Sequence, residues 1–407
     1  MRALTPISTK EDRELILATL ILGMLAFAVG AADYFATLNW TATIPRDATT
    51  LAVGRDFLDF WVNGRAAWGA DPGRLYDTHK LASALVPIVG ANYLGQTWAY
   101  PPSILLLAAP FGRLPYFPAL LCWTALGVCS FIWSVSRFIP DRRAAIAVVL
   151  SPAAMFGLMS GQISFFCASI ALMGLSQLDR RPLLSGFLAG LLSVKPQYFV
   201  LFPLLFASSG RWRALLAASC TLVLIGVATS VVWGPHIWLA YLQHGIPSGG
   251  LVLSDPNMVV APFMPTLFMN LRVAGLGLAP AMAAQTVLAL ASGAALVWMC
   301  RARKPSDAMM AAVFLACSAC AVPYLLSYDT LALSAAAMAL VSAGKLDAVG
   351  RRLAQLVYWL PLIQIGLGIH RIPGPALIIP VFACYVFVRA ISETKSTVHA
   401  SSQTAPS

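Results

Sequence analysis

Two aspartates three residues apart carry the spacing best suited to acid–base chemistry. Asp56 and Asp59 stand in the aromatic run Gly54-Arg-Asp-Phe-Leu-Asp-Phe-Trp61. If this run is helical, both side chains point to one face of the helix. Burial among aromatic rings raises a carboxylate's pKa, whereas a neighbouring arginine lowers it. A carboxylate in such a place can take a proton from a sugar hydroxyl; the alternative is that both aspartates pair with nearby arginines and only fold the segment.

A lysine between apolar residues is the second candidate. Lys195 is followed by Pro196, which interrupts a helix. A lysine at membrane depth needs an anionic partner, and the phosphate of a lipid headgroup is the natural one. The alternative is a lysine that extends from a hairpin tip toward water. Arg65 and Arg74 are further cations that could help to bind the same phosphate.

Uncharged and aromatic side chains provide candidate ligands for sugar hydroxyls. Gln162 lies at a Gly-Gln break, and three short aromatic motifs add further hydrogen-bonding groups: Tyr76-Asp77, Tyr100-Pro-Pro102 and Tyr328-Asp329. Tyrosines at a membrane interface can also form an aromatic belt with no ligand role. His236 and His244 lack a carboxylate partner pattern and no Asp-x-Asp motif occurs, so we expect neither a metal nor another cofactor. The eight cysteines lie in apolar stretches, as small core residues do.

The composition places these residues in a membrane protein. Of 407 residues, 59% are hydrophobic and 11% charged, with a mean hydropathy of +0.77. An average soluble domain has about 25% charged residues. The apolar stretches are continuous rather than alternating, which predicts an all-α polytopic membrane protein rather than a barrel. A soluble enzyme, a nucleic-acid-binding module and a disordered scaffold are excluded.

About twelve helical segments are predicted, separated by charges or turn residues. They cover residues 15–38, 115–136, 144–158, 163–178, 183–194, 196–207, 214–233, 281–300, 307–326, 330–343, 354–370 and 374–391. Several are shorter than the ~20 residues that cross a bilayer. The short segments meet at Gly161-Gln162, Lys195-Pro196 and Tyr328-Asp329, which predicts helical hairpins whose tips stop at or below the membrane surface.

The distribution of basic residues orients the chain. Most of the 27 Lys and Arg residues fall on the side of the predicted bundle that carries both termini, which is the cytoplasmic side by the positive-inside rule. This also accounts for the net charge of +11 without nucleic acid. We expect a cytoplasmic N-terminus over 1–14, one transmembrane unit over 15–391 and a disordered cytoplasmic tail over 392–407. Outer loops are expected over 39–100 and 234–280.

The ordered set of motifs resembles bacterial glycosyltransferase family 87 over about residues 50 to 340. The motifs that carry the resemblance are Gly54-Arg-Asp56-Phe, Tyr76-Asp77, Tyr100-Pro-Pro102, Pro110, Gly161-Gln162, Gly190-Leu-Leu-Ser-Val-Lys195-Pro196 and Pro323-Tyr-Leu-Leu-Ser-Tyr328-Asp329. The resemblance implies a GT-C-like fold in the bacterial inner membrane, with an active site facing the periplasm. It also implies inverting transfer of a hexose, with mannose the best-known case, from a polyprenyl-phosphate-sugar to a glycan or glycolipid hydroxyl.

The resemblance assigns the general base to Asp56, while Asp59 stands at a position that the pattern leaves variable. Some relatives carry histidine at the third tip, where this chain has Tyr328-Asp329, so a histidine-dependent role is not carried over. The main alternative is a secondary transporter or lipid flippase, which also has broken helices. Transporters, however, gather polar groups near the midplane and show two related halves, whereas here the acids collect in one outer loop. A non-catalytic scaffold is disfavoured by the number of costly polar tips.

Overall fold

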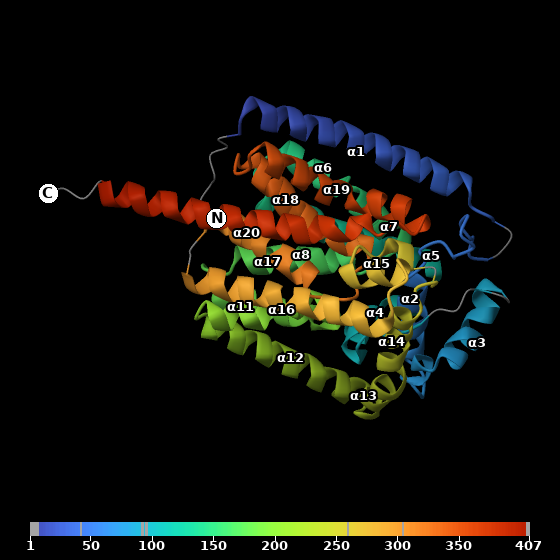
Figure 1. Ribbon diagram of the computed structural model, residues 1–407. Helices are drawn as coiled ribbons and strands as arrows, with labels where there is room; N and C mark the ends of the chain where they lie inside the picture. Colours follow the sequence, from blue (N-terminus) through green and yellow to red (C-terminus); the bar gives the residue numbers. More distant parts are fainter. Residues whose placement is uncertain are drawn as a thin grey trace.

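The computed structural model describes residues 8–40, 43–90, 93, 97–258, 260–302 and 305–403. Helices make up most of this part, and its β pairing is limited to two isolated bridges, Asn39–Arg46 and Arg46–Ala52. The long helices run side by side with their axes in a common direction (Figure 1). The protein is therefore all-α, as the sequence predicts.

Six helices in the described residues are long and apolar enough to cross a membrane. Side chains such as Ile21, Leu25 and Val29 in the first of them remain exposed, which suits a surface that faces lipid. These six helices define a multi-pass membrane protein. They are α1 (Lys10–Ala36), α5 (Tyr116–Phe138), α12 (Trp212–Trp233), α16 (Leu278–Ala302), α19 (Ala348–Ile369) and the span Gly374–Glu393, which contains the first part of α20 (Ile378–Gln403).

The shorter helices fill the space between these spans. Helices α6 (Arg142–Val149) and α7 (Pro152–Ser160) are bent by 41° and together reach the length of a seventh span. All twelve residues of α18 (Leu331–Ser342) are buried, and a helix that is apolar on every side belongs in a core. Each of the twelve predicted segments coincides with helix, but only six or seven spans meet the length and composition of a full crossing.

The three predicted interruptions are present. Helix α7 ends at Gly161 in the left-handed conformation, and α8 (Ser164–Ser176) follows. Helix α9 (Pro182–Leu191) leads through a 3-10 turn to Lys195, where α10 (Pro196–Phe199) begins. Between α17 (Asp307–Cys320) and α18, a 3-10 turn over Ser327–Thr330 carries the third tip. Proline and a left-handed glycine cannot continue a helix, which explains why the sequence revealed these positions.

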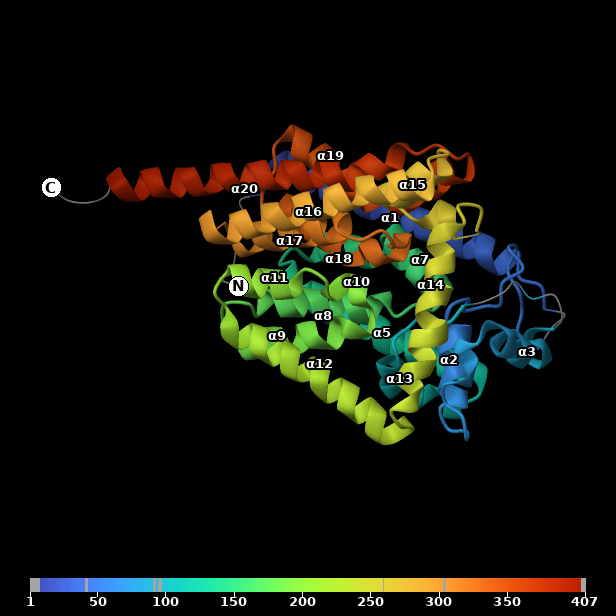
Figure 2. The same ribbon diagram turned by 60° about the horizontal axis from the view of Figure 1, so that its bottom comes forward.

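The two predicted outer segments lie at the same end of the bundle. Helix α1 begins and α20 ends at one end, whereas α2 (Phe57–Ala66), α3 (Thr78–Val89), α13 (His236–Ala240) and α14 (Ile246–Ser254) gather at the other (Figures 1 and 2). Short helices α4 (Leu105–Ala108) and α15 (Leu267–Val273) belong to the same end. The site residues of the first segment are therefore far from the termini.

Two regions contain helix within segments that the sequence predicted as an outer loop and as a tail. Residues 234–280 were expected to be a loop, but they form α13, a π-helical turn over Tyr241–Gly245, α14 and α15. Helix α20 continues through residues 392–403, where the sequence predicted a disordered tail. An established helix extends with one new hydrogen bond per residue, and residues 392–403 contain no glycine or proline to stop it. Residues 404–407 of the predicted tail lie outside the described part.

Glycines allow α2 to pack against its neighbours at backbone distance. A Cβ added to Gly112 would lie 2.2 Å from the carbonyl carbon of Gly64 in α2. A Cβ added to Gly161 would lie 2.6 Å from the Cβ of Phe57, at the start of the same helix. Helix α2 lies so close to the first hairpin tip that no residue larger than glycine fits at these contacts. This contact fixes the carboxylates of α2 relative to Gln162.

Candidate active site

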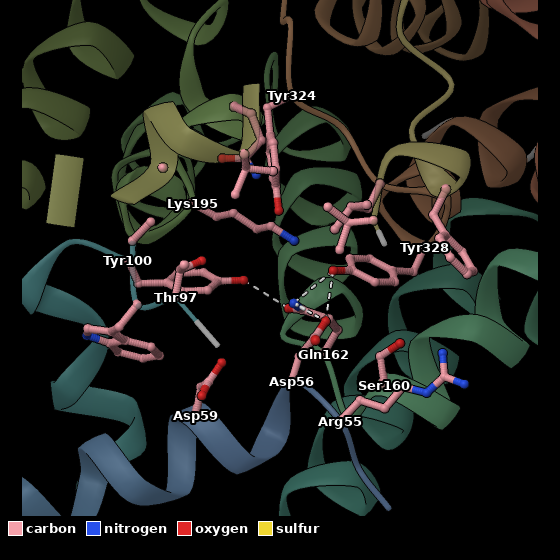
Figure 3. A pocket seen from close by; sticks show the side chains of 18 of the residues that line it. Arg55, Asp56, Asp59, Thr97, Tyr100, Ser160, Gln162, Lys195, Tyr324 and Tyr328 are labelled. Atoms are coloured by element: carbon pink, nitrogen blue, oxygen red, sulfur yellow. Dashed lines mark hydrogen bonds between the residues drawn. The ribbon is translucent and has the colours of Figure 1, made fainter. Parts of the chain in front are cut away.

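A cavity of about 380 Å³ lies between α2, the three hairpin tips and α14. Its polar lining includes Arg55, Asp56, Asp59, Tyr100, Gln162, Lys195, Tyr324 and Tyr328, with Thr49, Thr97, Ser160, Gln197 and Ser327 beside them. Its apolar lining includes Phe156, Val252, Leu253, Met258, Val260 and Phe263. Figure 3 shows the polar side chains converging on one space from separate elements.

The carboxylate of Asp56 is held by two hydrogen bonds. The side-chain amide nitrogen of Gln162 donates to its Oδ2 at 2.9 Å, and the hydroxyl of Tyr328 donates to the same oxygen at 2.9 Å. Tyr100 in turn donates to the amide oxygen of Gln162 at 3.0 Å (Figure 3). Four residues that lie far apart in the chain therefore form one network around Asp56, and the network fixes the orientation of its carboxylate.

The environments of Asp56 and Asp59 separate their protonation states. Burial raises the pKa of Asp56, while the hydrogen bonds from Gln162 and Tyr328 lower it in part. The charges of Arg55 and Lys195 lower the pKa of Asp56 further. Burial raises the pKa of Asp59 well above its ordinary range, and the charge of Asp56 adds to this. Two neighbouring carboxyls with such different surroundings lose their protons in sequence, so Asp56 is the member of the pair that ionises first.

Lys195 is a buried cation with a buried carboxylate partner. Its ammonium forms an ion pair with Asp329, and the two side chains are 3% and 0% exposed. Tyr198 donates to the backbone oxygen of Asp329 at 2.8 Å, and the backbone N–H of Leu326 donates to Oδ2 at 3.2 Å. The second and third tips are thus joined by a charge pair, which the sequence did not predict. Lys195 faces the main cavity, whereas Asp329 lies behind it.

Two arginines, Arg65 and Arg74, were predicted to help bind phosphate, but the arginine that lines the cavity is Arg55. Arg65 is exposed and lies over the ring of Trp61 at 4.8 Å, and Arg74 is exposed at a short turn; neither lines the cavity. Arg55 does line it, and its Nε donates to Asp47 at 2.7 Å. Its position next to Asp56 in the Gly-Arg-Asp motif was the available signal.

Three predicted ligands occupy different places. Tyr100 lines the cavity and holds Gln162. Tyr76 is buried behind it, donates to the backbone oxygen of Tyr100 at 2.8 Å and does not line the cavity. Asp77 caps the N-terminus of α3, where the backbone N–H groups of His79 and Lys80 lower the pKa of its carboxyl. Tyr76 and Asp77 therefore support the fold of the first segment from outside the cavity.

Several lining residues were not predicted as site residues. Tyr324 lies within the Pro323-to-Asp329 motif, so its neighbours gave a signal. Ser160 directly precedes the Gly-Gln tip. The apolar lining contributed by α14 gave none, because apolar residues in a membrane protein are too common to mark a site. In the described part of the chain, no three His, Cys, Asp or Glu side chains gather in a group able to hold a metal ion.

The arrangement of these residues indicates a class of protein. A fixed carboxylate, a buried lysine and uncharged hydrogen-bonding groups surround one cavity at the end of a multi-pass helical bundle, and part of that cavity is apolar. Such a site can bind an amphipathic molecule and move a proton within it. This arrangement suits a membrane enzyme.

The chain belongs to glycosyltransferase family 87. The model of that family matches residues 98–323, just over half of the chain, as the motifs predicted. Tyr100, Gln162 and Lys195 fall inside the matched region; Asp56, Asp59 and Tyr328 lie outside it, and the fold brings them to the same cavity. Searches of curated proteins and of solved structures found no match. The protein is thus a membrane glycosyltransferase.

Proposed function

We propose that the protein transfers a hexose from a polyprenyl-phosphate-sugar to a hydroxyl of a glycan or glycolipid, with inversion and with Asp56 as the general base. The observation that carries this proposal is the position of Asp56, which two donors hold in a cavity that Lys195 also lines. The family membership supplies the reaction class. The donor, the base and the stereochemical outcome are the proposed details, and mannose is the first sugar to test.

The lining of the cavity supports a lipid-linked donor. Val252, Leu253 and Phe263 belong to its apolar lining, which suits the first units of a polyprenyl chain. The ammonium of Lys195 has three N–H donors. One of them is used in the hydrogen bond to the carboxylate of Asp329. The remaining donors are available to the phosphate that joins lipid and sugar. A leaving phosphate is already an anion, so the reaction needs a nearby cation and no general acid.

Asp56 supports one-step inversion. In an inverting transfer, a carboxylate removes the proton from the attacking hydroxyl while the bond from sugar to phosphate breaks. Protonated Asp56 cannot do this, so transfer requires a pH at which Asp56 is ionised. Gln162 and Tyr328 donate to Oδ2 of Asp56, and no bond from either of them occupies Oδ1. In the proposed reaction Oδ1 accepts the proton.

The proposed site faces the periplasm from the bacterial inner membrane. Arg13, near the start of α1, lies beside Arg142 and Arg143 at the end of the bundle that carries the termini. Basic residues concentrate on the cytoplasmic side of membrane proteins. The cavity lies at the opposite end, with α2 and α14. This distribution supports an outward-facing site.

The function is tested with membranes that contain the full chain and a radiolabelled polyprenyl-phosphate hexose, first mannose and then glucose. We expect label to appear in a new glycan or glycolipid, and only when the donor can reach the outer face. Intact spheroplasts and inverted vesicles provide that comparison. Label that crosses the membrane while it remains on the donor lipid would instead identify a transporter or flippase.

A change at Tyr328 should alter the pH dependence of transfer. The variant Tyr328→Phe keeps the ring but removes the hydroxyl that donates to Asp56. Because that hydrogen bond lowers the pKa of Asp56, its loss raises the pKa further. The acidic limb of kcat/KM should therefore move to higher pH by about one unit, the size expected for one hydrogen bond to a charged group.

The variant Tyr198→Phe is the matched control for Tyr328→Phe. Tyr198 also loses a buried hydroxyl, but that hydroxyl donates to Asp329 and not to Asp56. Its pH profile should keep the wild-type acidic limb. Equal profiles for Tyr328→Phe and wild type would show that Asp56 does not limit the reaction at acidic pH.

A further inference from the structure

Asp59 has an oxygen that the fold buries and leaves without a partner. Its residue is 7% exposed, and in the described part of the chain Oδ1 has no hydrogen-bond partner. The side chain of Asp59 lines the cavity and points into it beside Thr97 and Tyr100 (Figure 3). An unpaired buried carboxyl oxygen is costly, and native proteins rarely keep one without a use. The other carboxyl oxygen, Oδ2, also has no hydrogen-bond partner in the described residues, and it is not enclosed in this way, so a ligand in the cavity would meet the carboxyl of Asp59 at Oδ2.

The location of Asp59 relative to Asp56 limits what that partner can be. The two residues lie three positions apart at the start of α2, so their Cβ atoms are about 5–6 Å apart on one face. Both carboxyls line the same cavity. One small molecule can therefore reach both, provided that it carries two hydrogen-bonding groups close together.

We infer that Asp59 binds a second hydroxyl of the acceptor while Asp56 deprotonates the attacking one, so that the acceptor is a sugar with a free hydroxyl beside the reacting one. This inference rests on the proposed function. To the glycan or glycolipid acceptor named there it adds the free hydroxyl beside the reacting one and the residue that binds it. Asp59 is then a binding residue that touches substrate, and it takes no proton in the reaction. A serine or threonine hydroxyl of a protein has no second hydroxyl for Asp59.

The protonation of the pair supports this division of roles. Burial and the charge of Asp56 hold the pKa of Asp59 well above its ordinary range. A protonated carboxyl can donate one hydrogen bond and accept another, as a sugar hydroxyl also does. Asp59 in this form is suited to bind a hydroxyl and unsuited to deprotonate one. The amide of asparagine, which also donates and accepts, should substitute for Asp59 but not for Asp56.

The first test identifies the group to which the labelled sugar becomes attached. Membranes with the full chain are incubated with labelled polyprenyl-phosphate mannose, and the product is examined by linkage analysis and by β-elimination. We expect the label on a sugar residue that carries a free hydroxyl next to the new linkage. Release of label from serine or threonine would overturn the inference while leaving the transfer reaction intact. Absence of any transferred label would instead count against the proposed function.

The second test uses octyl α-mannoside and its monodeoxy analogues as acceptor probes, with 1-octanol as a probe that has one hydroxyl. One analogue lacks the hydroxyl next to the reacting position. With the wild-type enzyme, its kcat/KM should be roughly 10–100-fold lower than that of octyl α-mannoside, because Asp59 is left unpaired. Octanol should be at least as poor. Equal use of octanol and the mannoside, or transfer to a serine peptide but to no mannoside, would overturn the inference.

Variants at Asp59 test whether this residue causes the preference for octyl α-mannoside over the deoxy analogue. Asp59→Leu should weaken transfer to the full acceptor by about the same factor and abolish the preference over the deoxy analogue, with the KM for donor unchanged. Asp59→Asn, which retains the polar group and guards against a folding defect, should keep the preference within about threefold. Loss of transfer in Asp59→Asn as large as in Asp56→Asn would make Asp59 the base and overturn the assignment.

Discussion

Replacing Asp56 with asparagine should reduce sugar transfer by roughly 10²–10⁴-fold, the usual contribution of a general base. Asparagine retains a side-chain oxygen that can accept the hydrogen bonds from Gln162 and Tyr328, so the network and the fold should persist. It cannot take a proton. The initial rate of transfer from labelled donor, measured with equal amounts of folded protein, gives the effect.

Asp77→Asn is the matched control for this substitution. Asp77 belongs to the same outer segment but caps α3, and its carboxylate does not line the cavity. Asparagine is also a good N-cap, so the helix should remain stable. Asp77→Asn should keep nearly full transfer. If Asp56→Asn also keeps it, the base must be sought at Asp59 or at Asp329.

The local geometry of the carboxylates followed from sequence because helical spacing is a local property. Asp56 and Asp59 were expected on one face, and the structure places Asp56 at the start of α2 and Asp59 in its first turn. The three hairpin tips were also local: each contains glycine, proline or a polar pair between short apolar segments. Such residues interrupt helices wherever they occur, so their positions needed no tertiary information.

Helical spacing did not correctly predict which arginine side chains enter the cavity. Arg65 follows Asp59 by six residues, which at 3.6 residues per turn places it on a different side of α2. Its side chain is exposed and lies over Trp61 instead of entering the cavity. Arg74 lies beyond the end of that helix, where a turn decides its direction. Arg55 lines the cavity instead, and its place beside Asp56 in the Gly-Arg-Asp motif is the part of this result that the sequence could show.

Pairings between distant segments were also beyond the sequence. Lys195 and Asp329 were each recognised as costly charges, but 134 positions separate them, and a single sequence does not show which tips meet. The same holds for α14, whose apolar residues reach the cavity from a segment expected to be a loop. A cavity built from several tips is a tertiary property, and each tip alone shows only part of it.

Variants of the Lys195–Asp329 pair should show whether Lys195 contributes to stability, to sugar transfer or to both. Lys195→Met leaves the carboxylate of Asp329 buried without a cation, which costs about 3–5 kcal/mol of stability, and it also removes the proposed phosphate ligand. A thermal melt of the solubilised protein should show the first effect, and the transfer assay the second. The single variant alone cannot separate them, because an unstable protein also loses activity.

The double variant Lys195→Met/Asp329→Asn removes both charges and keeps an oxygen for the N–H of Leu326. Neutral replacement of a buried ion pair is often close to neutral for stability, so the melting temperature should return toward wild type. Transfer should stay low, with the defect expressed as a raised KM for the donor. Recovery of transfer together with stability would mean that Lys195 only joins two tips, and that the phosphate is bound by another cation, with Arg55 the next one to test.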